Sequence, residues 1–227
     1  MLRILVADDH RVLREGLKRI IEQTRDMSVV AEAADGPEVL TKVAKTNLDV
    51  LLLDISMPGP SGLDILKQVK TRWPKLSVLM LSQHPEDHYA IRALRAGASG
   101  YLTKESASGE LIAAIRKVAG GGKYVSESLA EKMASALDFS GDKPLHESLS
   151  DREYEILCLF GAGKTVSQIA DDLALSVKTV STYRSRILEK MNMTKTPELI
   201  LYVVQAQLIP AQHAKAVPAP RLSRRRS

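Results

Sequence analysis

The sequence predicts an α/β domain with a doubly wound, five-stranded parallel sheet, followed by an all-α domain. Two observations support this fold class. Over residues 1–120, short apolar runs rich in β-forming residues alternate with helical stretches, and from residue 149 onward the pattern is helical only. Strands that alternate with helices are typical of a parallel sheet covered by helices on both faces.

The first domain, residues 1–120, is expected to contain five strands and five helices. The run 50–53 is apolar at every position, as a central strand buried on both faces requires. In a doubly wound sheet, ligands bind at the carboxyl ends of the strands. The expected strands are 2–7, 28–33, 50–53, 76–81 and 99–102, and the expected helices are 11–23, 37–45, 62–72, 86–96 and 107–118.

Glycines at 120–122 and a polar stretch at 138–148 mark residues 121–148 as a linker, with a helix near 126–137. The second domain, 149–209, is expected to hold four helices. The segment 210–227 is rich in Pro, Ala and Arg and is expected to be a disordered, basic tail. The four expected helices are 150–161, 166–173, 177–192 and 197–208.

Composition narrows the class of protein. The 227 residues are 44% hydrophobic and 26% charged, as in an ordinary globular protein, and the length suits two domains. Cys158 is the single cysteine, which excludes an intrachain disulfide or a cysteine-rich zinc site. The absence of a secretory signal or an apolar run of membrane length predicts a cytoplasmic protein with no membrane partner.

The formal net charge of +5 is a weak indicator of nucleic-acid binding, because its distribution is uneven. Most of the excess lies in the last seven residues, which include Arg221, Arg224, Arg225 and Arg226.

Polar side chains follow four of the five expected strands. Asp8 and Asp9 follow the first strand, Asp54 the third, Ser82 the fourth and Lys104 the fifth. Taken singly, each has an ordinary interpretation as a helix cap, a turn residue or a solvated lysine. Because these strand ends meet at one edge of the sheet, the side chains are expected to converge there.

Clustered carboxylates are unfavourable unless a cation binds among them, and such a site suits Mg²⁺. An aspartate there could act as a nucleophile and form an acyl phosphate. Ser82 and Lys104 would then hold the phosphoryl oxygens.

Residues 1–120 resemble the flavodoxin-like receiver domain of response regulators. The resemblance rests on the motifs Ala7-Asp8-Asp9-His10, Asp54-Ile55-Ser56-Met57-Pro58-Gly59, Leu81-Ser82 and Tyr101-Leu102-Thr103-Lys104. It implies that Asp54 accepts phosphate from a sensor histidine kinase. It also implies a Mg²⁺ site formed by Asp8, Asp9, Asp54 and the Ser56 carbonyl. Ser82 and Lys104 would sense the phosphoryl group, and Tyr101 would turn inward when Ser82 moves.

Two positions depart from the common receiver pattern. Ser82 stands where many receivers have Thr, which keeps the hydroxyl, and Glu105 stands where many have Pro. The loop after Lys104 is therefore expected to differ in conformation from that of receivers with Pro, whereas the phosphoryl chemistry is expected to be the same.

The segment 166–192 has the pattern of two short helices joined by a turn. Ile169, Ala170 and Leu173 would form the inner face of the first helix, and Ser176 would cap the second. Residues 178–195 contain five basic side chains and one acidic side chain, a local excess that suits contact with phosphates. The alternative is an ordinary solvated helix in a small bundle. The candidates for DNA contact are Lys178, Thr179, Ser181, Thr182, Tyr183, Arg184, Ser185 and Arg186.

From Leu149 to Leu208 the chain resembles a LuxR-type, four-helix DNA-binding domain, so the whole chain resembles the NarL/FixJ class of transcriptional regulators. The resemblance implies promoter DNA with paired half-sites as a partner, and RNA polymerase as a further one. Ser181, Thr182 and Ser185 are the candidates for base reading. The candidates for phosphate contact are Lys178, Thr179, Arg184 and Arg186, with Tyr183 where many members have His.

The last expected helix is apolar nearly all round, which predicts that part of it meets a second copy of the chain on DNA. Leu199, Tyr202 and Val203 are the expected contacts of this homodimer. The alternative is that the helix is only a core helix of its own domain.

The sequence predicts a two-component response regulator whose DNA binding is switched by phosphorylation of Asp54. One alternative is a Mg²⁺-dependent aspartyl phosphohydrolase, but Ser56 stands where such enzymes have a second carboxylate. We therefore expect no enzymatic turnover beyond self-phosphorylation and slow autodephosphorylation. Another alternative is a DNA-binding regulator independent of phosphorylation, which the intact set of site residues disfavours.

The sequence 161–165 resembles part of a P-loop but lacks its first glycine, because position 158 is Cys. We therefore expect no nucleotide binding at this motif.

Overall fold

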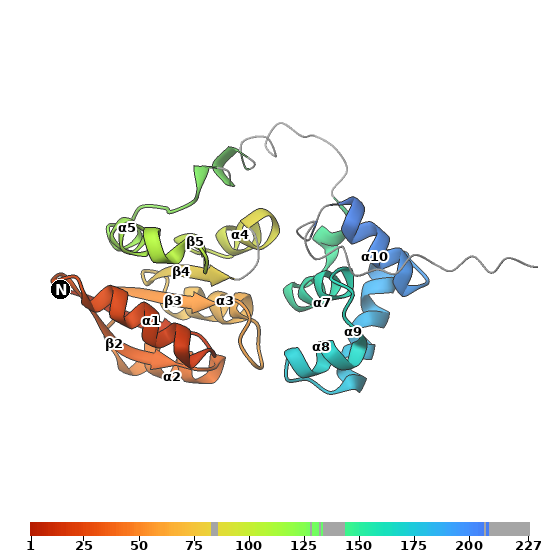
Figure 1. Ribbon diagram of the computed structural model, residues 1–227, viewed down its shortest axis with the longest axis horizontal. Helices are drawn as coiled ribbons and strands as arrows, with labels where there is room; N and C mark the ends of the chain where they lie inside the picture. Colours follow the sequence, from red (N-terminus) through yellow and green to blue (C-terminus); the bar gives the residue numbers. More distant parts are fainter. Residues whose placement is uncertain (83–85, 128, 132, 134–143, 207, 209–227) are drawn as a thin grey trace, which may run out of the picture. The chain divides into compact units, whose positions relative to one another are not determined.

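The computed structural model describes residues 1–82, 86–127, 129–131, 133, 144–206 and 208 (Figure 1). The described residues divide into two compact units, one built on those of 1–143 and the other on those of 144–172 and 176–208. Within the described residues, no helix is both long enough and apolar enough to cross a membrane.

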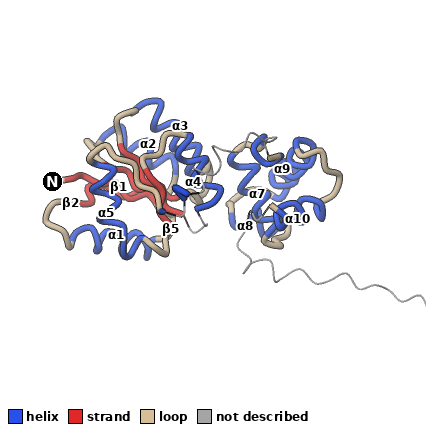
Figure 2. The backbone as a smooth tube through the Cα atoms, turned by 90° about the horizontal axis from the view of Figure 1, so that it is seen from above, coloured by secondary structure: helices blue, strands red, loops and turns tan. Residues whose placement is uncertain are grey.

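The first unit is a five-stranded parallel sheet in the order β2-β1-β3-β4-β5. Figure 2 shows α2 and α3 on one side of the strands and α1 and α5 on the other. The predicted fold class is confirmed, and each element begins and ends within one residue of its expected bounds. The elements are β1 Leu2–Ala7, α1 Arg11–Glu22, β2 Met27–Ala33, α2 Gly36–Lys45, β3 Val50–Asp54, α3 Gly62–Arg72, β4 Ser77–Ser82, α4 Glu86–Arg95, β5 Gly100–Thr103 and α5 Ala107–Ala119.

The core of this unit lies on both faces of the central strands. Every residue of β3 is buried, as its continuous apolar run predicts. On one face, Leu17 and Ile21 of α1 and Leu111 and Ile115 of α5 pack with side chains of β1, β3 and β4. This packing fixes the strands against one another, so the loops at their carboxyl ends are held on a rigid base.

Residues 121–148, predicted as a linker, are partly bound to the two units. The Tyr124 amide donates to the Ser99 carbonyl at 3.0 Å, and the Tyr101 amide donates to the Tyr124 carbonyl at 3.1 Å. At the other end, the 3-10 turn Leu145–Ser148 belongs to the second unit, where His146 Nδ1 lies 2.8 Å from Tyr202 Oη. The predicted linker is therefore too long at both ends.

Some predictions concern residues outside the described parts of the chain. Of the helix expected near 126–137, residues 126, 127, 129–131 and 133 are described, and all of these except 126 are helical. The tail expected at 210–227 lies outside the described residues.

The second unit contains four α-helices in the described residues, as predicted. Ser150 begins α7 with a reciprocal capping box to Glu153, and Ser176 caps α9 through the Thr179 amide at 3.0 Å. The last helix ends three residues earlier than its expected limit at 208. The helices are α7 Asp151–Gly161, α8 Val166–Asp172, α9 Val177–Lys190 and α10 Thr196–Gln205.

An ion pair joins the start of α7 to the end of α9. Lys190 Nζ lies 2.6 Å from Glu153 Oε2. Burial alone would raise the pKa of Glu153, but the hydrogen bonds from Lys190 and Ser150 lower it overall. Lys190, one of the five basic side chains of residues 178–195, is thus paired within the unit.

Two of the three residues predicted for dimerisation are instead core residues. Leu199 and Val203 of α10 are fully buried, so their assignment to a dimer contact is wrong. The residue that decides this packing is Gly161 at the end of α7, because a Cβ there would lie only 2.2 Å from Val203 Cγ1. Tyr202 is half-buried and lies beside His146.

We expect Gly161→Ala to lower the free energy of unfolding of the second unit by about 1–3 kcal/mol, because the added methyl group overfills the contact with Val203. Urea unfolding followed by far-UV circular dichroism measures the change. The cost should shrink in a Val203→Ala background, since the clash is then removed. Equal costs in both backgrounds would show that Val203 is not the obstacle.

Candidate phosphorylation site and DNA-binding helix

The strand register brings the predicted site residues of the first unit together. Ala7 of β1 pairs with Leu53 of β3, so Asp8 and Asp54 are neighbours. Asp54 in turn pairs with Leu81, which places Ser82 one residue further along the adjacent strand. Ser82 pairs with Thr103, and the Lys104 amide donates to the Ser82 carbonyl at 2.7 Å.

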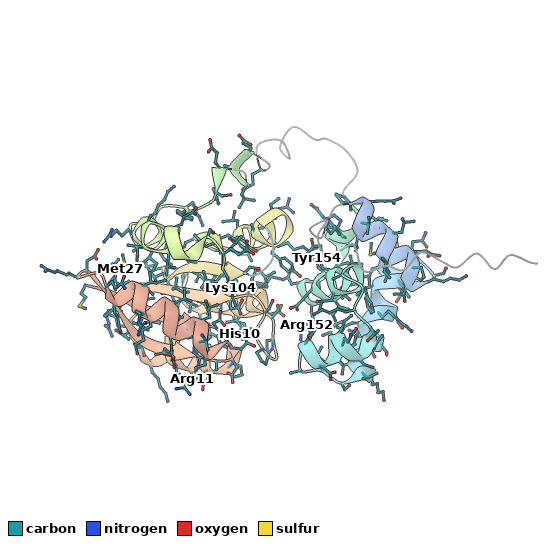
Figure 3. The ribbon with its side chains drawn as sticks, viewed as in Figure 1. His10, Arg11, Met27, Lys104, Arg152 and Tyr154 are labelled. Atoms are coloured by element: carbon teal, nitrogen blue, oxygen red, sulfur yellow. The ribbon has the colours of Figure 1, made fainter. Side chains whose placement is uncertain are left out.

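Lys104 links two buried carboxylates. Its Nζ lies 2.7 Å from Asp54 Oδ2 and 2.7 Å from Asp8 Oδ2. The other oxygen of Asp54 accepts a hydrogen bond from the Ser56 amide at 3.2 Å. The structure therefore places the predicted phosphoacceptor between a cation and a backbone donor. Figure 3 labels Lys104 and His10, which lie at this edge of the sheet.

Burial raises the pKa of Asp54 above its ordinary value; the Lys104 charge opposes this rise and the Asp8 charge adds to it. Burial alone would lower the pKa of Lys104, but Asp54 and Asp8 raise it overall. The Asp54 carboxylate is thus poorly solvated, and nearby positive charge favours its ionised form.

The donor set is compatible with binding of a metal ion. Asp8, Asp9, His10 and Asp54 each offer one ligand atom, and these atoms lie within 4.8 Å of one another. Asp9 is partly exposed, which leaves room for water on one side of the cluster. Carboxylates with open water positions are the ligands Mg²⁺ prefers. Ser56 is placed in the site by its amide, and the role of its carbonyl as a ligand remains a prediction.

The two predicted switch residues are buried. Ser82 and Tyr101 have no exposed surface. Tyr101 already has the inward position that the switch requires, and its movement together with Ser82 remains a prediction.

Two residues at this edge were not assigned roles from the sequence. His10 Nδ1 lies 2.7 Å from Asp9 Oδ1, and its amide donates to Asp8 Oδ1 at 2.8 Å, so it orients both carboxylates. Gly62 lies where a Cβ would approach the Asp54 carbonyl oxygen to 2.1 Å. In the sequence, Gly62 is seen only as the residue at the start of the expected helix 62–72. A glycine at a helix start does not by itself indicate close packing against a strand.

The structure divides the predicted DNA-contact residues of α9 into an exposed face and its flanks. Val180 and Ile187 form a buried stripe along α9. The candidates beside this stripe are half-buried, and Arg184 has its Nε atom buried without a hydrogen-bond partner. The exposed candidates are Lys178, Thr182, Ser185 and Arg186, and the half-buried ones are Thr179, Ser181, Tyr183 and Arg184.

Short side chains on α9 bond to the helix itself. Thr182 Oγ1 donates to the Lys178 carbonyl at 3.0 Å, and Ser185 Oγ donates to the Ser181 carbonyl at 3.2 Å. Between α8 and α9, Ala174 has a φ of 51°, a left-handed conformation that allows a tight turn. This is the geometry of a helix-turn-helix whose second helix presents a polar, basic face.

Comparison with known proteins agrees with both units. The model of the response regulator receiver domain matches residues 4–116, and that of the luxR family of bacterial regulatory proteins matches residues 147–203. The chain is 35% identical to response regulator UvrY of Escherichia coli K12 over 214 residues, covering 93% of this chain and 98% of UvrY. The chain belongs to the NarL/FixJ family of response regulators.

Other members of the NarL/FixJ family align over nearly the full length. Response regulator GacA of Pseudomonas aeruginosa is 36% identical over 213 residues, covering 93% of this chain and 99% of GacA. The structure of RcsB from Salmonella enterica serovar Typhimurium, bound to promoter rprA in the presence of phosphomimetic BeF3⁻, is similar with a TM-score of 0.62 at 28% identity. That alignment covers 90% of this chain and 99% of RcsB. This NarL/FixJ protein is thus a two-component response regulator with a receiver and a LuxR-type DNA-binding domain.

Proposed function

We propose that a sensor histidine kinase phosphorylates Asp54 and that the phosphoryl group controls binding of the LuxR-type domain to promoter DNA. The observation that carries this proposal is the buried Lys104 ammonium, which lies 2.7 Å from both Asp54 and Asp8. A fixed cation beside a carboxylate suits the charge that develops as a phosphoryl group is transferred.

In the transfer, an Asp54 carboxylate oxygen attacks the phosphorus of a phosphohistidine. A P–O bond forms and the P–N bond breaks, and the imidazole leaves with the electron pair and gains a proton. Lys104 then pairs with a phosphoryl oxygen, and the Ser82 hydroxyl donates to another. Mg²⁺, held by Asp8, Asp9, Asp54 and the Ser56 carbonyl, would supply positive charge to the phosphoryl oxygens.

The phosphorylated site is proposed to be a switch and not a turnover enzyme. The residue two positions after Asp54 is Ser56, which cannot serve as the general acid of an aspartyl phosphohydrolase. Hydrolysis of the acyl phosphate is therefore expected to be slow, which gives the phosphorylated state time to act. The protein must reach both the histidine kinase and the promoter DNA, so we propose that it acts in the cytoplasm. RNA polymerase is proposed as a further partner.

A homodimer on paired half-sites is proposed to form through the exposed face of α10. Leu201 and Val204 lie three residues apart on this helix and are 57% and 43% exposed. Leu201 and Val204 replace the buried Leu199 and Val203 as candidates for the dimer contact. Tyr202 is half-buried and lies between the exposed and the buried face of α10. A small apolar face on an otherwise polar surface suits contact with a second copy of the helix.

Leu201→Asp combined with Val204→Asp is expected to weaken binding to paired half-sites by about a hundredfold, because two linked sites bind far more tightly than one. Binding to a single half-site should be unchanged. Electrophoretic mobility shifts with phosphodonor-treated protein measure both affinities. The matched control is Val30→Asp, an exposed apolar position in the receiver unit. Equal losses in the control, or an unchanged affinity in the double variant, would contradict this interface.

A further inference from the structure

The second unit, taken without the segment that follows it, carries no excess of positive charge. Residues 144–208 contain seven Lys or Arg and eight Asp or Glu side chains, a net charge of −1. Charges act on a polyanion such as DNA over about 10 Å at ordinary salt, so the summed charge of a small domain affects its attraction to DNA. The unit as a whole therefore adds no attraction to that of the basic face of α9.

Three of the seven cations are also held in ion pairs within the unit. The pairs are Arg152–Glu155 and Lys190–Glu153, each at 2.6 Å, and Lys164–Asp172. The other four are Lys178, Arg186 and Lys195, which are exposed, and Arg184, which is half-buried. Few cations of the folded unit are thus available to the phosphates of DNA.

The segment after this unit has the opposite composition. Residues 209–227 contain five Lys or Arg side chains and no Asp or Glu, and they lie outside the described residues. Including this segment changes the net charge from −1 to +4. Four of its cations form a cluster in the sequence, here called the arginine cluster: Arg221, Arg224, Arg225 and Arg226.

The chain leaves the second unit from a fixed point. Leu208 is buried, its amide donates to the Val203 carbonyl at 2.9 Å, and its carbonyl oxygen lies 3.9 Å from Cys158 Sγ. Arg221 stands 13 residues after Leu208, a length that spans at most about 43 Å. A domain of about 65 residues is only about 30 Å across. The arginine cluster can therefore reach DNA held against α9.

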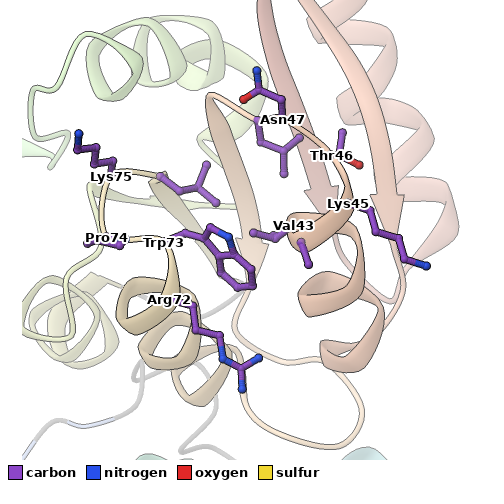
Figure 4. A pocket seen from close by; sticks show the side chains of 11 residues that line it. Val43, Lys45, Thr46, Asn47, Arg72, Trp73, Pro74 and Lys75 are labelled. Atoms are coloured by element: carbon purple, nitrogen blue, oxygen red, sulfur yellow. The ribbon is translucent and has the colours of Figure 1, made fainter.

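The groove of the receiver unit is unsuited to the arginine cluster. It surrounds Trp73 and is lined by residues 43–48 and 72–76, none of which is acidic. Figure 4 shows that its basic side chains point away from the indole ring, where they would repel another cation. At the phosphorylation site, Lys104 is already bonded to the buried carboxylates. These features favour an external polyanion over a contact within the chain.

We propose that the arginine cluster binds the phosphate backbone of DNA beside the site held by α9. Arginine forms charge-assisted hydrogen bonds with phosphate, and phosphate contacts carry no sequence information. The cluster therefore strengthens binding to every DNA sequence by a similar factor. This contact rests on the proposed function and adds to the contact made by α9. A surface of anionic lipids also attracts clustered arginines, but the unit that holds this segment is a DNA-binding domain.

The experiment measures binding of the full-length protein to promoter DNA and to an unrelated duplex of the same length. Fluorescence anisotropy over a range of salt concentrations gives the affinity and the slope of log K against log salt. Loss of four phosphate contacts should reduce this slope by about three to four for both duplexes. Both affinities should fall by about tenfold or more at low salt, and by less at higher salt. The variant combines Arg221→Ser, Arg224→Ser, Arg225→Ser and Arg226→Ser.

Two controls accompany this variant. Lysine at the same four positions keeps the charge and should keep the salt slope near that of the wild type. The second control removes four exposed cations of the receiver unit and should leave affinity and slope near the wild-type values. It combines Arg19→Ser, Arg25→Ser, Arg72→Ser and Lys75→Ser. Far-UV circular dichroism and thermal melting check that each variant is folded.

The unrelated duplex distinguishes failure of this proposal from failure of the phosphorylation switch, because binding to it requires neither phosphorylated Asp54 nor base reading. The proposal is overturned if the serine variant keeps its affinity and slope, if its loss is confined to the promoter, or if the receiver control loses as much. A wild type that binds neither duplex would contradict DNA binding itself. Binding to phosphatidylglycerol vesicles that is lost in the serine variant, with DNA binding unchanged, would assign the cluster to a membrane surface instead.

Discussion

Replacing Asp54 by alanine is expected to abolish the single phosphoryl adduct that the wild-type protein forms with a small phosphodonor and Mg²⁺. The adduct requires an ionised carboxylate beside a fixed cation, and Lys104 lies 2.7 Å from Asp54 Oδ2. Intact-mass spectrometry measures the fraction of protein that carries the adduct. Chelation of Mg²⁺ with EDTA should reduce this fraction in the wild type as well, because the carboxylate cluster would repel the incoming phosphate.

The control for this substitution is Asp171→Ala, which removes an exposed aspartate of α8 in the second unit. It should leave the adduct unchanged. An adduct that survives Asp54→Ala would move the phosphoacceptor to another residue, with Asp8 and Asp9 the nearest carboxylates.

Replacing Lys178 and Arg186 together by alanine is expected to weaken promoter binding by about 2 kcal/mol, or roughly thirtyfold. Both side chains lie on the exposed face of α9, where phosphate groups of DNA can reach them. Each lost contact should also reduce the slope of log K against log salt by about one. Fluorescence anisotropy with labelled promoter DNA over a range of salt concentrations measures both quantities.

Arg19→Ala with Arg25→Ala removes the same charge from exposed positions of the receiver unit and serves as the matched control. Its affinity and salt slope should remain near those of the wild type. If both pairs of substitutions had the same effect, net charge and not the face of α9 would determine binding.

The elements and the phosphorylation site were predictable because their signals are local. Apolar periodicity gave each strand and helix of the receiver within one residue, and Asp8, Asp54 and Lys104 lie at or directly after the ends of strands. Parallel pairing then brings them together without further information. The basic, polar pattern of α9 was likewise local.

The predictions that failed depend on packing between distant segments. An all-round apolar helix does not show which face is buried. Leu199 and Val203 are buried, and Gly161 lets α7 approach Val203 closely. Tyr124 joins the sheet edge through backbone bonds, which leave no side-chain signal. The groove around Trp73 is formed by two segments with no shared motif, so periodicity could not reveal it.

The central claim is that phosphorylation of Asp54 controls DNA binding, and one measurement tests it directly. It compares the affinity of the full-length protein for promoter DNA with and without phosphodonor and Mg²⁺, in the wild type and in Asp54→Ala. Phosphodonor should tighten binding about tenfold or more in the wild type and have no effect in the variant. The claim is contradicted if phosphodonor leaves the wild-type affinity unchanged, or if it tightens binding equally in Asp54→Ala.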